Sequence, residues 1–382
     1  MNILITGGAG FIGYHTANAL AEKGCKVRVL DNLNPQVHKE PKQSLARLHP
    51  GVEFLYGDVR NHNDLIKALK DVQVVYHFAA ETGVGQSMYN MDCYVDVNVR
   101  GTAIVCECLA ELKRNIRKLI LASSRAVYGE GNYLCNKCGV IHPNNPRSRE
   151  HLKLGKWDFD CPQCCNPTTP MPTGENALLH PTSVYGITKR TQEELFSTFS
   201  HAFEIPTVML RYFNVYGPGQ SLSNPYTGIA TIFCTRMLAN KPIEIYEDGE
   251  MLRDFVDIRD VVQANLKSAL FDQPGLSTFN IGSGASVSIR RFAELLKAII
   301  CSRSKIIISS RYRIGDIRHS IANISLAKKE LGYIPRSSKE EGIKDLVDWA
   351  KSRTESSALD LALQKLSAMG LTGVANKSKR SD

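Results

Sequence analysis

NILITGGAGFIG, residues 2–13, is the segment from which the architecture of this chain can be inferred. Residues 2–6 form an apolar strand pattern, and a helical pattern follows the glycines at positions 7, 10 and 13. Such a turn lets the backbone approach a pyrophosphate closely and points a helix N-terminus at it. Asp31, about 20 positions later at the end of a second strand pattern, would accept hydrogen bonds from an adenosine ribose and repel a 2′-phosphate. The segment therefore predicts an NAD site rather than an ordinary glycine turn.

Strand and helix patterns alternate beyond this segment. Strands are expected at 26–30, 52–56, 73–78, 118–122 and 207–211, and helices at 64–69, 97–113, 182–203, 229–240, 261–271 and 289–300. This alternation is typical of βαβ units in a parallel sheet. The expected fold is α/β: a Rossmann-type doubly wound parallel sheet with a smaller α/β C-terminal substrate domain and a four-cysteine metal-binding insert.

The expected organisation has three parts. Residues 1–180 form the dinucleotide-binding domain, which an insert at 130–172 interrupts. Residues 181–352 form the substrate-binding region, part of whose chain returns to the first domain. Residues 353–382 form a polar tail, expected to be mobile or to dock as a late helix through a weak amphipathic stretch at 358–369.

Composition narrows the class of protein. The 382 residues are 43% hydrophobic and 22% charged, as in ordinary globular chains. No stretch of about 18 uncharged apolar residues is present, so a membrane span is not expected. The chain shows no secretory signal, which predicts a cytoplasmic protein. The net charge of +9 suits an anionic small substrate as well as a nucleic acid; its only basic cluster is at 377–380, and no nucleic-acid partner is expected.

Three further residues indicate proton chemistry. Tyr185 and Lys189 are four residues apart, so they share one face of a helix. An ammonium group beside a phenol lowers the pKa of the phenol and makes it a usable base. Ser124, at the end of a predicted strand, could hydrogen-bond the reacting oxygen.

Five of the eleven cysteines fall between positions 135 and 165. Cys135 and Cys138 form one C-x-x-C pair, and Cys161 and Cys164 form another. Two such pairs in a reducing compartment predict a closed, structural four-thiolate zinc site. The insert could wall the substrate pocket, bind a protein or nucleic-acid partner, or only stabilise a long loop, and the last is favoured for the ion itself.

A family resemblance emerges from motifs in order along residues 1–350. The chain resembles extended short-chain dehydrogenase/reductases of the nucleotide-sugar epimerase/dehydratase branch. The matching motifs are TGGAGFIG (6–13), DNL (31–33), HFAA (77–80), NVRGT (98–102), SSRAVYG (123–129), RYFNVYGP (211–218), RDFVD (253–257), NIGSG (280–284) and RIGD (313–316), together with Tyr185 and Lys189.

The resemblance implies roles for individual residues. Tyr185 would be the base, Lys189 would tune it and hold the nicotinamide ribose, and Ser124 would assist. The residues implied to bind NAD are Gly7, Gly10, Phe11, Ile12, Gly13, Asp31, Asn32, Asp58, Val59, Ala79, Ala80, Asn98, Tyr185 and Lys189; those implied to bind the nucleoside-diphosphate sugar are Ser124, Asn214, Arg253, Arg313 and Asp316. Asp58 is equally plausible as a turn residue, and Arg253 could instead form a surface ion pair with Asp254 or Asp257. The family also implies a homodimer formed through helices 97–113 and 182–203.

The two positions after Ser124 bear on the reaction. In this branch, 4,6-dehydratases carry Asp-Glu there and glucuronate decarboxylases a glutamate, whereas this chain has Arg125 and Ala126. Epimerisation at carbon 4 through a transient ketone needs no carboxyl group at these positions. The favoured interpretation is an NAD-retaining 4-epimerase, with a closer resemblance to bacterial dTDP-L-rhamnose 4-epimerases or to UDP-glucose/galactose enzymes. The alternatives are a related reductase, 2-epimerase or decarboxylase, or a non-enzymatic scaffold that uses the insert to bind a partner.

Overall fold

A seven-stranded sheet forms the centre of the first domain, in the order β13-β9-β5-β4-β1-β2-β3, and every neighbouring pair of strands is parallel. The computed structural model describes residues 1–112, 115–143, 147–226, 228–353 and 359–375. The strands of the sheet are β1 (Asn2–Thr6), β2 (Lys26–Asp31), β3 (Val52–Tyr56), β4 (Val74–His77), β5 (Lys118–Ser124), β9 (Thr207–Tyr212) and β13 (Leu276–Ile281). The predicted parallel sheet is confirmed.

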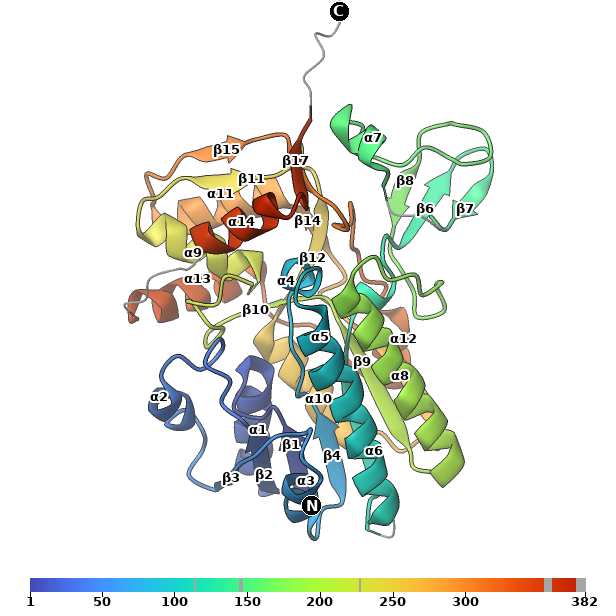
Figure 1. Cartoon of the computed structure of the whole chain (residues 1–382), viewed down its shortest axis with the longest axis vertical. Helices are drawn as coiled ribbons and strands as arrows, with labels where there is room; N and C mark the ends of the chain where they lie inside the picture. Colours follow the sequence, from blue (N-terminus) through green and yellow to red (C-terminus); the bar gives the residue numbers. More distant parts are fainter. Residues whose placement is uncertain (113–114, 144–146, 227, 354–358, 376–382) are drawn as a thin grey trace, which may run out of the picture.

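Helices cover both faces of this sheet (Figure 1). Side chains alternate along a strand, so Ile3 and Ile5 of β1 pack on one face, and Leu4 packs on the other. The Ile3 face is covered by α1 (Phe11–Glu22), α10 (Ile258–Leu270) and α12 (Ser325–Glu330); the Leu4 face is covered by α3 (His62–Leu69), α6 (Gly101–Glu111) and α8 (Val184–Phe203). Shorter elements on the way are α2 (Pro41–Leu45), α4 (Val84–Ser87), α5 (Met91–Tyr94), a π-helix (Val95–Arg100) and a 3-10 helix (Arg125–Val127).

The strand order reverses between β1 and β4, because the chain runs from β1 outward to β2 and β3 and then returns to place β4 on the other side of β1. The loops that follow β1 and β4 therefore lead in opposite directions along the sheet. In open parallel sheets, ligands bind beyond the carboxyl ends of the strands at such a switch point. The glycines of residues 7–13 follow the carboxyl end of β1, so the fold places them at that position.

The later part of the chain builds a second core beyond the carboxyl ends of the parallel strands. It contains β10 (Asn214–Tyr216), β11 (Ile243–Ile245), β12 (Leu252–Asp257), β14 (Ser286–Ser288), β15 (Ile306–Ile308), β16 (Arg311–Arg313), α9 (Ile229–Leu238), α11 (Ile289–Ile300) and α13 (Lys339–Lys351). Phe233, Phe255, Phe292 and Leu346 are buried at its centre. Because β9 and β13 belong to the large sheet, this part of the chain crosses between the two cores.

The insert forms a small unit of its own, which projects beside the second core in Figure 1. It consists of β6 (Asn132–Cys135), β7 (Gly139–Ile141), α7 (Arg149–Lys153) and β8 (Thr169–Met171), with β6 in the middle of a three-stranded antiparallel sheet. Its own apolar cluster consists of the paired cysteines and Ile141. The insert is therefore held together chiefly around the cysteines.

The described part of the tail packs against the rest of the protein. Residues 359–375 form α14 (Leu359–Ala368) and β17 (Thr372–Val374), and β17 pairs antiparallel with β16. Of the two expectations for the tail, a mobile segment or a docked helix, the described residues follow the second. Positions 354–358 and 376–382, which include the basic cluster at 377–380, lie outside the described residues.

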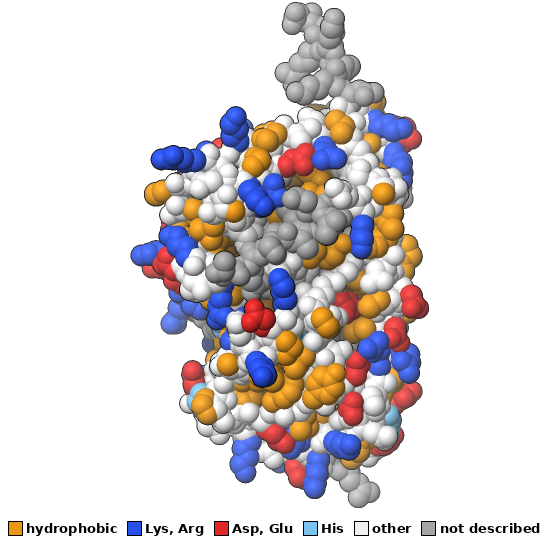
Figure 2. Space-filling model, turned by 60° about the vertical axis from the view of Figure 1, so that its left-hand side comes forward, with side chains coloured by type: hydrophobic (Ala, Val, Ile, Leu, Met, Phe, Trp, Pro, Cys, Tyr) orange, Lys and Arg blue, Asp and Glu red, His pale blue; other side chains and the backbone are white. Residues whose placement is uncertain are grey.

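Two surface observations bear on possible partners. Among the described residues, no helix combines the length and apolarity that a bilayer crossing requires. On the face shown in Figure 2, Lys and Arg side chains are interspersed with Asp and Glu side chains. The excess positive charge of the chain is thus not gathered into one basic stripe on that face.

Candidate active site and cysteine cluster

One cavity of about 810 Å³ lies between the two cores, and nearly all predicted site residues line it. The lining contains Gly7, Gly10, Phe11, Ile12, Gly13, Asp31, Asn32, Asp58, Val59, Ala79, Ala80, Ser124, Tyr185, Lys189, Asn214, Arg253, Arg313 and Asp316. Its volume is within the range of small-molecule and cofactor sites. The structure thus brings together residues that lie more than 300 positions apart in the sequence.

The glycines form a tight cradle at one end of this cavity. A Cβ added to Gly13 would lie 2.4 Å from the Gly7 carbonyl oxygen and 2.6 Å from the Gly8 Cα. Gly7 itself has a φ of +66°, and a Cβ there would lie 2.7 Å from the Ala79 nitrogen. Because the obstructing atoms are backbone, only glycine fits, and a pyrophosphate can approach the turn closely. The cradle fits NAD.

Asp31 is fixed at the position where a ribose would bind. Its carboxylate accepts hydrogen bonds from the backbone N–H groups of Ala9 (3.0 Å) and Leu33 (2.9 Å), and His38 lies 3.6 Å away. The side chain is buried but lines the cavity, so its charge is directed at the ligand. A fixed anion there would repel a 2′-phosphate, in line with the expectation of NAD rather than NADP.

Asp58 lines the adenine end of the cavity, although neighbouring side chains hold its carboxylate. Arg60 donates two side-chain hydrogen bonds to Asp58, at 2.9 and 2.6 Å, and Asn32 donates a third at 2.9 Å. These hydrogen bonds lower the pKa of Asp58 to about 2, so the group stays ionised. Asp58 therefore both stabilises the turn after β3, by accepting hydrogen bonds from Arg60, and lines the cavity.

Asn98 is the one predicted NAD contact that does not line the cavity. Its side chain is fully buried beneath the loop after β4, where it accepts a hydrogen bond from the Glu81 N–H (2.7 Å) and donates one to the Glu81 carbonyl (3.1 Å). It also donates to the Thr188 hydroxyl at 3.0 Å. Asn98 therefore positions the loop that forms the cavity wall and ties it to α8, rather than touching the ligand.

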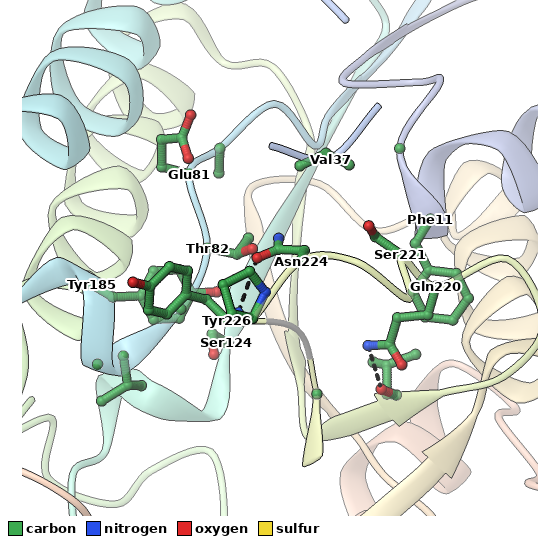
Figure 3. A pocket seen from close by; sticks show the side chains of 18 of the residues that line it. Phe11, Val37, Glu81, Thr82, Ser124, Tyr185, Gln220, Ser221, Asn224 and Tyr226 are labelled. Atoms are coloured by element: carbon green, nitrogen blue, oxygen red, sulfur yellow. Dashed lines mark hydrogen bonds between the residues drawn. The ribbon is translucent and has the colours of Figure 1, made fainter. Parts of the chain in front are cut away.

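Tyr185 and Ser124 face the middle of the cavity from α8 and the end of β5 (Figure 3). Ser183 caps the first turn of α8 by accepting a hydrogen bond from the Gly186 N–H, which fixes where the Tyr185 helix begins. Burial raises the pKa of Tyr185, while the hydrogen bond with Ser124 and the nearby Arg125 guanidinium lower it. Ser124 and Arg125 thus favour the phenolate, the form that can take a proton.

Lys189 lies one turn after Tyr185 on α8, as the sequence spacing predicts. It donates a hydrogen bond from Nζ to the Ala122 carbonyl oxygen (2.8 Å), and burial lowers its pKa to about 7. Arg125, which the sequence reasoning did not single out for this role, adds a positive charge that lowers the Tyr185 pKa.

The other end of the cavity is positively charged. Arg253 is buried and donates hydrogen bonds to the carbonyl oxygens of Leu252, Ile317 and Arg318, each at 2.8 Å. It forms no ion pair with Asp254 or Asp257, which bind Ser283 and Arg259 instead, so the surface ion-pair alternative is wrong.

Two buried polar atoms near this end lack a partner among the described residues: the Asn214 Oδ1 and the Arg313 Nε. The Arg313 guanidinium stacks over the Tyr246 ring at 4.8 Å, and its Nε lies 3.6 Å from an Asp316 oxygen, beyond hydrogen-bonding distance. Burying a polar atom without a partner is costly, which marks a place prepared for a ligand. Guanidinium groups match phosphate oxygens in geometry and charge, so this end suits a diphosphate.

Several lining residues were missed by sequence reasoning. Thr82, Gln220, Ser221, Asn224 and Tyr226, labelled in Figure 3, line the same cavity as Tyr185 and Phe11. Ala362, Leu363 and Leu366 of α14 complete the wall from the tail. The only available signal was the apolar spacing within 358–369, which predicted a helix but not what it covers.

The four paired cysteines come together in the insert as predicted. Their Sγ atoms all lie within 4.8 Å of one another, and those of Cys135 and Cys164 are 3.6 Å apart. Zn–S bonds of about 2.3 Å in a tetrahedron place sulfur atoms roughly 3.8 Å apart, so four thiolates in this arrangement fit one zinc ion. Cys165 is exposed and lies outside the cluster.

Comparisons with known proteins agree with this geometry. The family model described as NAD dependent epimerase/dehydratase family matches residues 3–152 and 164–282, with its interruption inside the insert. A dTDP-L-rhamnose 4-epimerase of Burkholderia thailandensis is 37% identical over 91% of this chain and 94% of that protein.

Solved structures give the same result. The UDP-glucose 4-epimerase of Thermotoga maritima with UDP-glucose is 29% identical, with a TM-score of 0.75 over 92% of this chain and 99% of that one. The UDP-glucuronic acid 4-epimerase of Bacillus cereus, in complex with UDP-glucuronic acid and NAD, is also 29% identical, with a TM-score of 0.74 over the same shares. The glycine cradle, the tyrosine-lysine helix and the matched length together show that this chain belongs to the NAD-dependent epimerase/dehydratase family, as a nucleotide-sugar epimerase.

Proposed function

We propose that this enzyme inverts carbon 4 of a nucleoside-diphosphate hexose, of the dTDP-L-rhamnose or UDP-glucose/galactose type, and retains its NAD through the cycle. The observation that carries the proposal is the cavity itself, in which Tyr185 and Ser124 lie between the glycine cradle and the arginines. An activated sugar whose diphosphate lies against Arg253 and Arg313 would extend its ring toward Tyr185.

The residues present suffice for this reaction. The Tyr185 phenolate takes the proton of the 4-hydroxyl, and Ser124 holds the same oxygen by a hydrogen bond. NAD, when bound, would supply reversible hydride transfer at carbon 4, with return of the hydride to the opposite face of that carbon. Tyr185 then gives the proton back to the oxygen, so no atom is gained or lost. Lys189, buried beside Ala122, would hold the nicotinamide ribose.

The two positions after Ser124 support epimerisation over elimination. Arg125 lines the cavity and Ala126 is buried. Neither side chain can act as a carboxyl acid or base, which the loss of water from the sugar requires. Arg125 instead contributes a positive charge beside Tyr185.

Proton NMR of the purified protein in heavy water, without added NAD, tests the proposal. The panel is dTDP-L-rhamnose, UDP-glucose and UDP-glucuronic acid, and the expected result is an isomer of unchanged mass with no deuterium on the ring. Tyr185→Phe should reduce turnover by about 10²- to 10⁴-fold and keep the bound NAD. Tyr56→Phe, at a side chain that is 73% exposed on β3, is the matched control. Loss of water or carbon dioxide would refute the proposal.

We also propose that the cysteine cluster holds one structural zinc ion. Four thiolates leave no open position on the metal, so the ion would contribute folding energy rather than chemistry. Metal analysis should find about one zinc per chain. Cys161→Ser should lose the metal, whereas Cys165→Ser should keep it; a wild-type protein free of metal would contradict the assignment.

We infer a homodimer formed through the helices expected at 97–113 and 182–203, which in the structure are the π-helix with α6, and α8. Ile187 of α8 is 52% exposed, and Met91 and Val95 beside it are similarly exposed, an apolar group suited to a partner helix. Sedimentation should give twice the mass of 42.4 kDa. Ile187→Lys should shift the protein toward monomer, and an unchanged mass for this variant would exclude this surface.

A further inference from the structure

A residue shortly before each cysteine pair contacts the same segment of the chain, residues 316–319. Tyr133, two positions before Cys135, faces the His319 ring with centroids 6.1 Å apart. Asp158, three positions before Cys161, accepts a hydrogen bond from the Arg318 Nε at 2.7 Å and lies 3.3 Å from the His319 Nε2. The relative placement of the two pairs therefore sets the relative placement of two contacts to this segment.

Two more residues of the insert bind the same segment. The Glu130 carboxylate accepts the Arg318 backbone N–H at 2.8 and 2.9 Å, and it is buried. Arg147, also buried, donates a hydrogen bond to the Asp316 carbonyl oxygen at 3.0 Å. The insert thus contacts this segment at Asp316, Arg318 and His319, through both backbone and side-chain atoms.

Segment 316–319 in turn supports the positively charged end of the cavity. The carbonyl oxygens of Ile317 and Arg318 accept hydrogen bonds from the Arg253 guanidinium, which fixes its orientation. The Asp316 side chain lines the cavity beside Arg313. A continuous series of contacts therefore runs from the cysteine cluster to the residues expected to hold the diphosphate.

The NAD end of the cavity has no part in this series. The glycine cradle, Asp31 and Asp58 follow strands β1, β2 and β3, and Lys189 is on α8. None of the contacts described above between the insert and residues 316–319 involves these groups. A change in the insert should therefore act on one end of the cavity alone.

We propose that the metal-bound insert positions the nucleoside-diphosphate end of the active site, with Asp158 and Arg147 as positioning residues. This inference rests on the proposed function. A metal that joins the two cysteine pairs fixes the relative positions of Tyr133 and Asp158. These two residues contact His319 and Arg318, and the Arg318 carbonyl oxygen accepts a hydrogen bond from Arg253. An insert that served only to stabilise its own loop would leave nucleotide affinity unchanged.

Calorimetric titration of UDP and of dTDP into the NAD-retaining protein tests the proposal. Asp158→Asn removes the charge that binds Arg318 and His319, and the carboxylate is 62% exposed, so the variant should fold. We expect the Kd of the nucleotide that binds to rise about three- to tenfold. Asp160→Asn, at an exposed residue two positions along, is the control and should bind as the wild type does.

Removal of the metal by a chelator is the second arm, with metal content and bound NAD measured on the same sample. The Kd should rise as in Asp158→Asn, the NAD content should stay, and restored zinc should reverse the change. Unchanged affinity in Asp158→Asn, or in metal-free protein that keeps its NAD, would overturn the inference. A wild-type protein that binds neither nucleotide would contradict the proposed function itself, and this inference with it.

Discussion

Glu247 is the buried centre of the ion-pair network between the insert and the second core, and its replacement by glutamine gives a quantitative test. One carboxylate oxygen lies 2.8 Å from the Arg147 guanidinium, and the other lies 3.0 Å from that of Arg318. All three side chains are at most 3% exposed. Glu247→Gln keeps the shape but replaces one acceptor oxygen by an N–H donor group that points at a cation.

The magnitude follows from the partners that remain. Arg318 retains hydrogen bonds with Asp248 and Asp158, each at 2.7 Å, so its charge stays compensated. Among the carboxylates of the described residues, Arg147 retains an ion pair only with Glu130, with the two charged atoms 3.4 Å apart, and it keeps its hydrogen bonds to the Asp316 and Trp157 carbonyl oxygens. Removing one partner of a buried ion pair costs about 3–5 kcal/mol, and the retained partners favour the lower end of that range. We expect the free energy of unfolding to fall by about 3 kcal/mol.

Urea unfolding followed by tryptophan fluorescence measures this loss. The chain has two tryptophans, and the Trp157 carbonyl accepts a hydrogen bond from Arg147, so one probe lies in the network itself. The control is Glu194→Gln on α8. The Glu194 side chain is 61% exposed and pairs with Arg190, so its replacement should lower the free energy of unfolding by only about 0.3–0.5 kcal/mol. A loss below about 1 kcal/mol for Glu247→Gln would refute the view that this carboxylate compensates two buried cations.

Three further predictions concern other parts of the cavity. Gly13→Ala should destabilise the protein by about 1–3 kcal/mol and abolish NAD retention, because the new Cβ meets backbone atoms that cannot move aside; bound NAD measured after denaturation checks this, and full occupancy would contradict it. Asp58→Asn should cost about 2 kcal/mol at pH 7, since the folded-state pKa of about 2 lies below the unfolded value of 3.8. That stabilisation is complete above the unfolded pKa and is lost as the pH falls through the folded pKa, so at pH 3 the cost should be about half as large, and a cost independent of pH would show another origin. Leu366→Asp should weaken nucleotide binding about tenfold or more through repulsion of the diphosphate and leave NAD content unchanged, whereas equal loss of both would mean that α14 supports the whole cavity.

Much of the fold was predictable because local signals and burial agree. The strand at 52–56 and the helix at 289–300 have the boundaries expected from their apolar patterns, and Ser288 caps that helix by accepting the Arg291 N–H. The helix expected at 97–113 is instead a π-helix followed by α6. Backbone hydrogen-bond register carries no signal in side-chain periodicity, so the sequence could not show this difference.

The site was predictable where a motif is local and not where it depends on distant partners. The glycine turn and the Tyr185–Lys189 spacing act within one turn or one helix, and both are where the sequence places them. The carbonyl oxygens that orient Arg253, the role of Asn98 and the contribution of Leu366 depend on contacts between segments far apart in sequence. No spacing rule reaches across such separations.

The pairing of β17 with β16 has a consequence for how the enzyme matures during synthesis. Domains fold from the N-terminal side as the chain emerges, and the predicted NAD contacts all precede residue 190. The opposite wall of the same cavity needs Ala362, Leu363 and Leu366, which β17 anchors against the strand that carries Arg313. The wall opposite the predicted NAD contacts is therefore complete only after residues 362–374 have been synthesised and β17 has paired with β16.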